Sequence, residues 1–362
     1  MKSNYRYIVK AFMAMAVIAG TTSCDDFLDR EPMSSISPET YYSTAAQLEA
    51  NLNDEYPNVL PSFGQWTYGI FGEDKGTDNQ IEVNANDRYT QDRWKVPHSE
   101  SDNWKFERIY RINFFLSEAL PKFGEDMSGS QNTISGSVAT IKHYIGEMYF
   151  LRAYEYFKKL QLFGDFPIIN QPLADEMEAL REASKRFPRN EVARFIISDL
   201  DKAYAYMSDV DMATTRINKD VAMLVKSRVA LFEATWLQNF KGTAFVPGGE
   251  GWPGASLHNN YQYPSGNIDN EVKYFLEQAV EASKLVADKY KGSLTENTGV
   301  LQQSADDPSN PYFDMFAQED LSDVKEVLLW RQYARGLSTH NINAAAGRGN
   351  YRIGLTRGFV QN

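Results

Sequence analysis

One stretch, residues 137–160, constrains the fold of this chain more than any other. It has the length of a long helix, and from Tyr149 to Leu160 it is apolar nearly all round. A surface helix of a globular protein carries a polar face, so this stretch predicts a helix that is buried on several sides. Gly164 can then end the helix in a left-handed conformation, and Pro167 prevents its restart.

Arg152 places a charge inside that apolar helix. A buried guanidinium needs a carboxylate partner, because an unpaired charge in a protein interior is strongly destabilising. The same helix offers Glu147 and Glu155, and we expect one of them to pair with Arg152.

Helical spacing of apolar residues recurs in other parts of the chain. It is found in 45–60, in 104–120 with Pro121 closing the helix, in 191–207, in a helix that starts at Asn218, and in 270–290 with Asp269 or Asn270 as its N-cap. Long irregular segments lie between the helices, namely 62–103, 164–189, 239–269 and 292–325, and such loops are usually functional. The predicted fold class is mainly α, with tetratricopeptide-like helical hairpins and long irregular ligand-binding loops, although no clean repeat period is present.

The N-terminus has the pattern of a lipoprotein signal. A basic start is followed by a short apolar stretch at 11–19 and by small residues that lead to Cys24, the only cysteine. The apolar stretch is too short to remain as a membrane-spanning helix, and a lone cysteine cannot form an internal disulfide. We therefore expect 1–23 to be a signal peptide that is removed, leaving 24–362 anchored through a lipidated Cys24. The alternative is an ordinary signal peptide beside a chance cysteine.

Charge and hydropathy exclude two function classes. The formal net charge is −11 at pH 7 and the isoelectric point is about 5.0, without any basic cluster, so nucleic-acid binding is not expected. Beyond residue 23 no apolar run is long enough to cross a membrane.

The candidate ligand-binding residues lie in two of the long loops. Sugar binding needs flat aromatic faces for the apolar side of the ring, together with amides, carboxylates or arginines for the hydroxyls. Residues of these types are Trp66, Tyr68, Asp78, Asn79, Arg93 and Trp94 in the first loop and Trp252, Tyr261 and Tyr263 in the third. For each single aromatic side chain, buried packing is the alternative to a sugar platform.

Signals of catalysis are weak. The four histidines do not have a partner at the spacing of metal ligands on a helix, and the chain lacks a Gly-x-Ser-x-Gly elbow, a phosphate loop and a dinucleotide fingerprint. Carboxylate pairs such as Asp306-Asp307 and Glu319-Asp320 are typical of a solvated surface. We expect no catalytic residue, no metal and no cofactor.

Several motifs follow one another in an order typical of a known family. They are Cys24 with Asp-Asp-Phe-Leu-Asp; Trp104 with Tyr110, Ile112 and Asn113; Glu147, Phe150 to Ala153, Tyr156, Phe157 and Leu160 before Phe-Gly-Asp-Phe-Pro at 163–167; Arg189 before Asp199-Leu200; Lys219 to Arg228; and Tyr312-Phe313 with Phe316 and Trp330. With these motifs the chain resembles the N-terminal part of a SusD/RagB-type outer-membrane lipoprotein. Relatives of this type usually extend well beyond this length, so we expect a C-terminal portion to be missing.

The resemblance implies a function. It implies a non-catalytic, surface-exposed outer-membrane lipoprotein that captures an oligosaccharide and delivers it to a SusC-like TonB-dependent transporter. The acidic residues that follow Cys24 resemble the signal that sends Bacteroidetes lipoproteins to the outer face of the outer membrane. Two alternatives stay open: a RagB-like protein that captures peptides, and a surface glycoside hydrolase.

Overall fold

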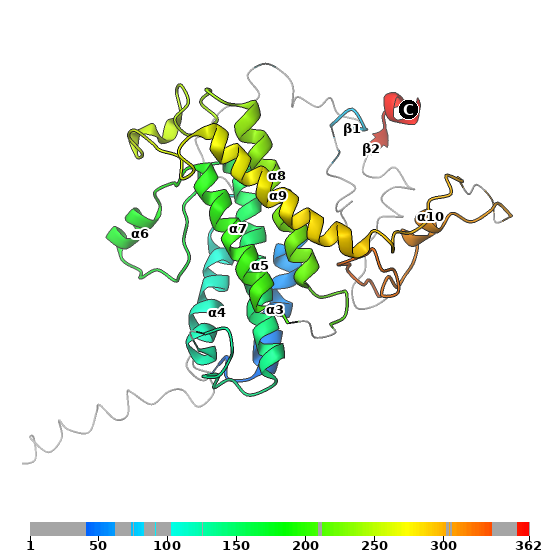
Figure 1. The fold of residues 1–362 in the computed structure, drawn as a ribbon, viewed down its shortest axis with the longest axis horizontal. Coiled ribbons are helices and arrows are strands. Elements are labelled where there is room, and N and C mark those ends of the chain that lie inside the picture. Colours follow the sequence, from blue (N-terminus) through cyan, green and yellow to red (C-terminus); the bar gives the residue numbers. More distant parts are fainter. Residues whose placement is uncertain are drawn as a thin grey trace, which may run out of the picture.

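The computed structural model describes residues 41–61, 74, 76–82, 91, 103–124, 126–208, 212–301, 304, 306–334 and 353–361. The predicted signal peptide, 1–23, and Cys24 lie outside the described residues. Within these ranges the chain is mainly helical, and its only sheet is a two-stranded one (Figure 1). The elements are α3 (Ala45–Val59), β1 (Gln80–Glu82), α4 (Glu107–Phe123), α5 (Val138–Phe163), α6 (Met177–Ala183), α7 (Arg189–Tyr206), α8 (Lys219–Asn239), η2 (Pro253–Ser256), α9 (Ile268–Tyr290), α10 (Pro311–Met315), β2 (Ile353–Leu355) and α12 (Arg357–Gln361).

The helix predicted at 137–160 is α5, and its burial on several sides is confirmed. It packs against α3, α4 and α7, while α7 also contacts α8, and α8 contacts α9 (Figure 1). Buried apolar side chains from all six of these helices form one continuous core. Ser137 caps the start of α5 by accepting a hydrogen bond from the Thr140 N–H, and Gly164 ends it with a φ of 67°.

Several predicted boundaries differ from the structure by up to three residues, and the structure explains two of these differences. Pro121 does not close α4, which continues to Phe123 because its last turn is held from outside: the Lys122 carbonyl accepts hydrogen bonds from both the N–H and the hydroxyl of Thr133. The N-cap of α9 is Asn267, whose side chain accepts the Asn270 N–H, so the helix begins before Asp269.

Arg152 pairs with a carboxylate, as expected, but neither Glu147 nor Glu155 is its partner. Its Nε and Nη2 donate to Asp199 of α7 at 2.6 and 2.8 Å. Its Nη1 donates to Asn113 of α4 and to the Asn170 carbonyl. Arg152 and Asp199 are both buried, so this pair joins α4, α5 and α7 inside the core.

The small sheet pairs β1 with β2 in antiparallel register, with Ile81 opposite Gly354. Among the helices that the structure describes, none combines enough length with enough apolar character to cross a membrane.

Candidate functional site

A pocket of about 590 Å³ lies where α5 ends and α7 begins. The loop 240–266, drawn in yellow-green in Figure 1, contributes one side of it. Its walls come from segments far apart in the sequence, namely the end of α5 with Phe163, Gly164 and Asp165, the segment before α7 with Arg186 and Arg189, Trp236 of α8, and Phe245, Trp252 and Leu257 of the loop.

Asp165 fixes the inner wall of this pocket. It follows the glycine that ends α5, and its Oδ2 accepts a hydrogen bond from Trp252 Nε1 at 2.7 Å. Its Oδ1 accepts the backbone N–H of Arg189, the first residue of α7, at 2.9 Å. Burial raises the pKa of the Asp165 carboxyl, and these two donors act against that rise. One carboxylate thus ties the end of α5 to the start of α7 and to the loop.

Arg189 forms the floor, although it is only 3% exposed. Its Nε and Nη2 donate to Glu233 of α8 at 3.0 and 2.9 Å, and its guanidinium lies 4.1 Å from the centre of the Trp236 ring. Burial raises the pKa of the Glu233 carboxyl, and the guanidinium opposes that shift. Because Glu233 is engaged by Arg189, its carboxylate is a structural partner within the wall.

Gly254 allows the Trp252 ring to lie directly on the loop backbone. A Cβ at Gly254 would come within 2.2 Å of Trp252 Cζ2, a distance that no side chain tolerates. The other neighbours of the ring are aromatic: His258 stacks on it at 5.9 Å between ring centres, and Tyr261 lies 5.6 Å away. The position of the Trp252 ring therefore depends on the absence of a side chain at Gly254.

The structure brings together the three candidates from the third loop. The rings of Tyr261 and Tyr263 are 5.2 Å apart, and Tyr261 also contacts Trp252. The Trp252 ring is only 5% exposed, so it forms part of the pocket wall and does not offer an open face. The two tyrosine hydroxyls donate to Asn190 and to the Pro247 carbonyl, and burial raises the pKa of both phenols.

Two candidates from the first loop, Asp78 and Asn79, do not join them. Asp78 and Asn79 lie in the turn before β1, where Thr356 donates hydrogen bonds to both of their carbonyls. Figure 1 shows β1 on the other side of the molecule from the loop 240–266. The remaining candidates, Trp66, Tyr68, Arg93 and Trp94, lie outside the described residues.

Asp165, Arg186, Arg189 and Phe245 were not among the predicted site residues. The Phe-Gly-Asp-Phe-Pro motif at 163–167 ends α5, and its aspartate also lines the pocket. The pairing that brings Asp165 beside α7 is a short backbone bridge between Phe166 and Phe187. The sequence contains one local signal for this site: the polar Asp165 follows the helix end at Gly164, and Pro188 precedes the next helix.

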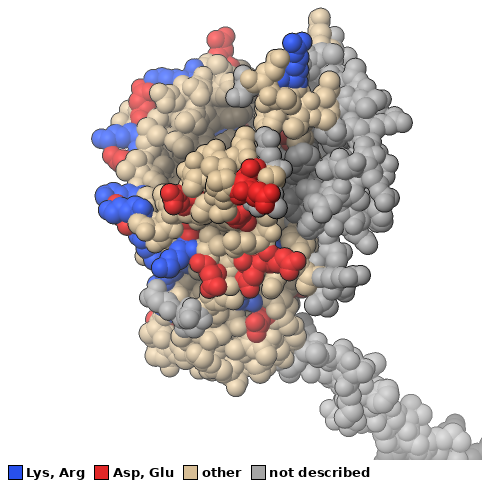
Figure 2. Space-filling model, turned by 90° about the vertical axis from the view of Figure 1, so that its right-hand side faces the viewer, with Lys and Arg blue, Asp and Glu red and all other residues tan. Residues whose placement is uncertain are grey.

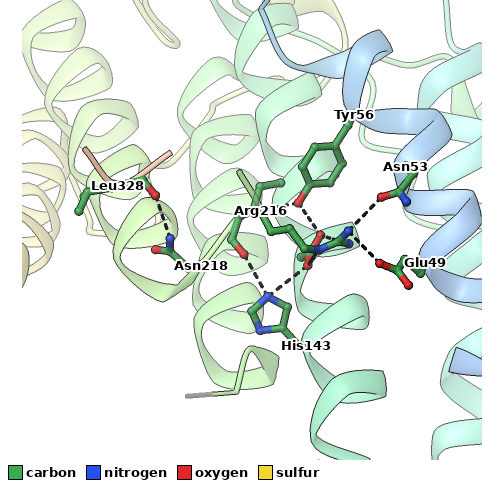
Figure 3. A network of polar contacts seen from close by, with 9 residues as sticks. Glu49, Asn53, Tyr56, His143, Arg216, Asn218 and Leu328 are labelled. Carbon is green, nitrogen blue, oxygen red and sulfur yellow. Dashed lines mark hydrogen bonds and ion pairs between the residues drawn. The ribbon is translucent and has the colours of Figure 1, made fainter. Parts of the chain in front are cut away.

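A second polar cluster is centred on the buried Glu147 and His143 (Figure 3). Glu147 of α5 accepts hydrogen bonds from Arg216 Nε and Nη2 at 3.0 and 2.9 Å and from the Tyr56 hydroxyl of α3. The His143 Nε2 lies 3.0 Å from the Ile217 carbonyl, which can only accept, so this nitrogen carries the proton. The cluster joins α3 and α5 to the segment that leads into α8, which is a structural role.

Acidic side chains gather near the centre of the face shown in Figure 2, which is the side of the molecule that carries α10 in Figure 1. Of the carboxylates predicted to be solvated, Asp306, Glu319 and Asp320 are exposed and Asp307 is half-buried. Within the part of the chain that the structure describes, no group of three or more His, Cys, Asp or Glu side chains is placed to hold a metal ion.

Comparison with known proteins identifies similar sequences and structures. The family model SusD-like_3, described as starch-binding and associating with the outer membrane, matches residues 26–231, more than half of the chain. The SusD-like proteins P2 and P25 of Formosa agariphila are each 25% identical to it, over 67% and 59% of this chain and over 46% and 41% of their own lengths. The chain thus spans less than half the length of these curated relatives. A SusD homologue from Bacteroides thetaiotaomicron has a TM-score of 0.44 at 18% identity, covering 72% of this chain and 43% of that structure.

Proposed function

Because the chain belongs to the SusD-like family of starch-binding, outer-membrane-associated proteins, we propose that it captures an oligosaccharide at the cell surface without cleaving it. Cys24 carries the lipid anchor, and 24–362 is the binding domain. The protein binds the glycan first and then passes it to a SusC-like TonB-dependent transporter, which imports it.

The pocket at the junction of α5 and α7 is the observation that carries this proposal. Its volume of about 590 Å³ falls within the range of sites for small ligands. Leu162, Phe245 and Leu257 line it with side chains that are 58%, 61% and 54% exposed. Such apolar groups suit the C–H face of a sugar ring, while polar groups within the pocket suit its hydroxyls.

The same pocket supports binding over hydrolysis. A glycoside hydrolase needs two carboxyl groups facing each other across the scissile bond, one as an acid and one as a base or nucleophile. Asp165 accepts hydrogen bonds from Trp252 and from the Arg189 N–H, and Glu233 is paired with the Arg189 guanidinium. Neither carboxylate is free to act as a catalytic acid.

The test is a binding titration of the mature chain 24–362 by calorimetry against a panel of oligosaccharides and a pool of peptides. We expect binding to glycans and no release of reducing ends during incubation. Phe245→Ala should weaken binding without lowering the melting temperature, because its ring is largely exposed. Phe316→Ala removes another exposed ring, which lies at the C-terminal end of α10 and does not line the pocket, and is the matched control. Peptide binding without glycan binding, or the appearance of reducing ends, would overturn the proposal.

A further inference from the structure

Arg189 presents an unused hydrogen-bond donor to the pocket. Its Nε and Nη2 are bonded to Glu233, but its Nη1 makes no hydrogen bond with any described residue. The position of Nη1 is marked by Gly164: a Cβ at this glycine would lie 3.3 Å from Nη1, and the φ of 67° also disfavours a side chain there. Both residues line the pocket, so the missing side chain leaves the Nη1 edge of this otherwise buried arginine facing the pocket.

Arg186 brings a second guanidinium to the same pocket. It lies 4.6 Å from the centre of the Trp104 ring, which holds its plane by a cation–π contact. Within the described part of the chain, no carboxylate forms an ion pair with it at 4.0 Å or less. The pocket therefore contains two arginine edges that are available to a ligand.

The carboxylates of the pocket are already engaged. Asp165 accepts hydrogen bonds from the Trp252 indole and the Arg189 N–H, and Glu233 accepts from the Arg189 guanidinium. The negative charge of Asp165 offsets part of the positive charge of Arg186 and Arg189. A preference for anions therefore depends on the guanidinium N–H groups that have no acceptor among the described residues, and not on the net charge of the pocket. An oxyanion with two oxygens on one atom, such as a carboxylate or a sulfate, fits an open guanidinium edge well, because it can accept two parallel hydrogen bonds.

We propose that this pocket receives an acidic sugar unit, whose carboxylate or sulfate group binds Arg186 and the Nη1 edge of Arg189. The sugar ring packs against Phe245, whose ring is exposed at the pocket. This inference rests on the proposed function, since it specifies which class of glycan the pocket selects.

The experiment compares acidic oligosaccharides with their neutralised forms on the mature chain 24–362. One arm uses oligogalacturonates and their methyl esters, which test a carboxylate. The other uses carrageenan oligosaccharides and their desulfated forms, which test a sulfate. A neutral arm uses malto-oligosaccharides and laminari-oligosaccharides. We expect one acidic form to bind about tenfold or more tightly than its neutralised form, as the loss of a charge-assisted hydrogen bond predicts.

Arg186 is the residue to vary, because it is exposed and its removal leaves the buried Arg189–Glu233 pair intact. Arg186→Gln should abolish the preference for the acidic form, and Arg186→Lys should restore it only in part because an ammonium lacks the planar fork. Arg181→Gln, at an exposed arginine of α6, is the matched control and should leave the preference unchanged. If neutral glycans bound as tightly as acidic ones, and binding depended on Phe245 but not on Arg186, this inference would be overturned and the proposed function would stand. Failure to bind any glycan in the three arms would overturn both.

Discussion

Replacing Trp252 tests whether the loop 240–266 is a packed wall of the pocket. The ring is 5% exposed, and its indole donates to Asp165 at 2.7 Å. Truncation of a buried tryptophan to alanine typically costs about 3–5 kcal/mol of unfolding free energy. The buried carboxylate of Asp165 also loses a donor, which by itself costs about 1–3 kcal/mol. Because the loop can collapse partly into the space, we expect Trp252→Ala to lose about 3–5 kcal/mol in all.

Trp252→Phe keeps an aromatic ring but removes the indole donor and part of the ring volume, so its loss is an upper limit for the contribution of the hydrogen bond. We expect it to lose about 1–3 kcal/mol. Urea unfolding followed by circular dichroism gives both values without relying on tryptophan fluorescence. Phe316→Ala, at a ring that is 72% exposed, should leave the midpoint unchanged. If Trp252→Ala unfolded at the same urea concentration as Phe316→Ala, the ring would not be buried in solution, and our description of the pocket wall would be wrong.

Three further predictions concern the core, the pH dependence and the anchor. Asp199→Ala should lower the free energy of unfolding in urea by about 3–5 kcal/mol, because it leaves Arg152 buried without its counter-charge. A double variant in which Asp199 is replaced by Leu and Arg152 by Met should recover most of this loss. Burial acts to raise the pKa of Glu271, but hydrogen bonds led by Arg194 outweigh it and hold that pKa below its usual 4.5. Glu271→Gln should therefore lower the free energy of unfolding by its largest amount above pH 4.5, and by less as the pH falls below 4.5. A difference between variant and wild type that did not change with pH would contradict the lowered pKa of Glu271. Metabolic labelling with palmitate should mark the wild-type protein and not Cys24→Ser; an unlabelled wild type would exclude the lipid anchor.

The revised expectation for Trp252 illustrates a limit of loop composition. Its position in a loop rich in glycine and polar residues suggested a ring open to sugar, but the same glycines let the chain fold tightly over it. Weaker glycan binding by Trp252→Ala would thus have two causes that the variant does not separate, namely the damaged pocket wall and the loss of any direct contact between the ring and the ligand. Phe245 is the cleaner probe of ligand contact, because its ring is exposed at the same pocket.

The sequence by itself determined the six helices of the core and their approximate boundaries, but not α6 and α10, which lie in segments predicted to be irregular. Apolar periodicity and capping side chains such as Ser137 and Asn218 act over one or two turns, so they can be interpreted without knowing the rest of the fold. The tertiary structure alone decided which charges and aromatic rings meet. Arg152 finds Asp199 at a separation of 47 residues, and Asp165 finds Trp252 at 87. Contacts at such separations depend on how whole helices pack, and the periodicity of a single segment contains no information about them.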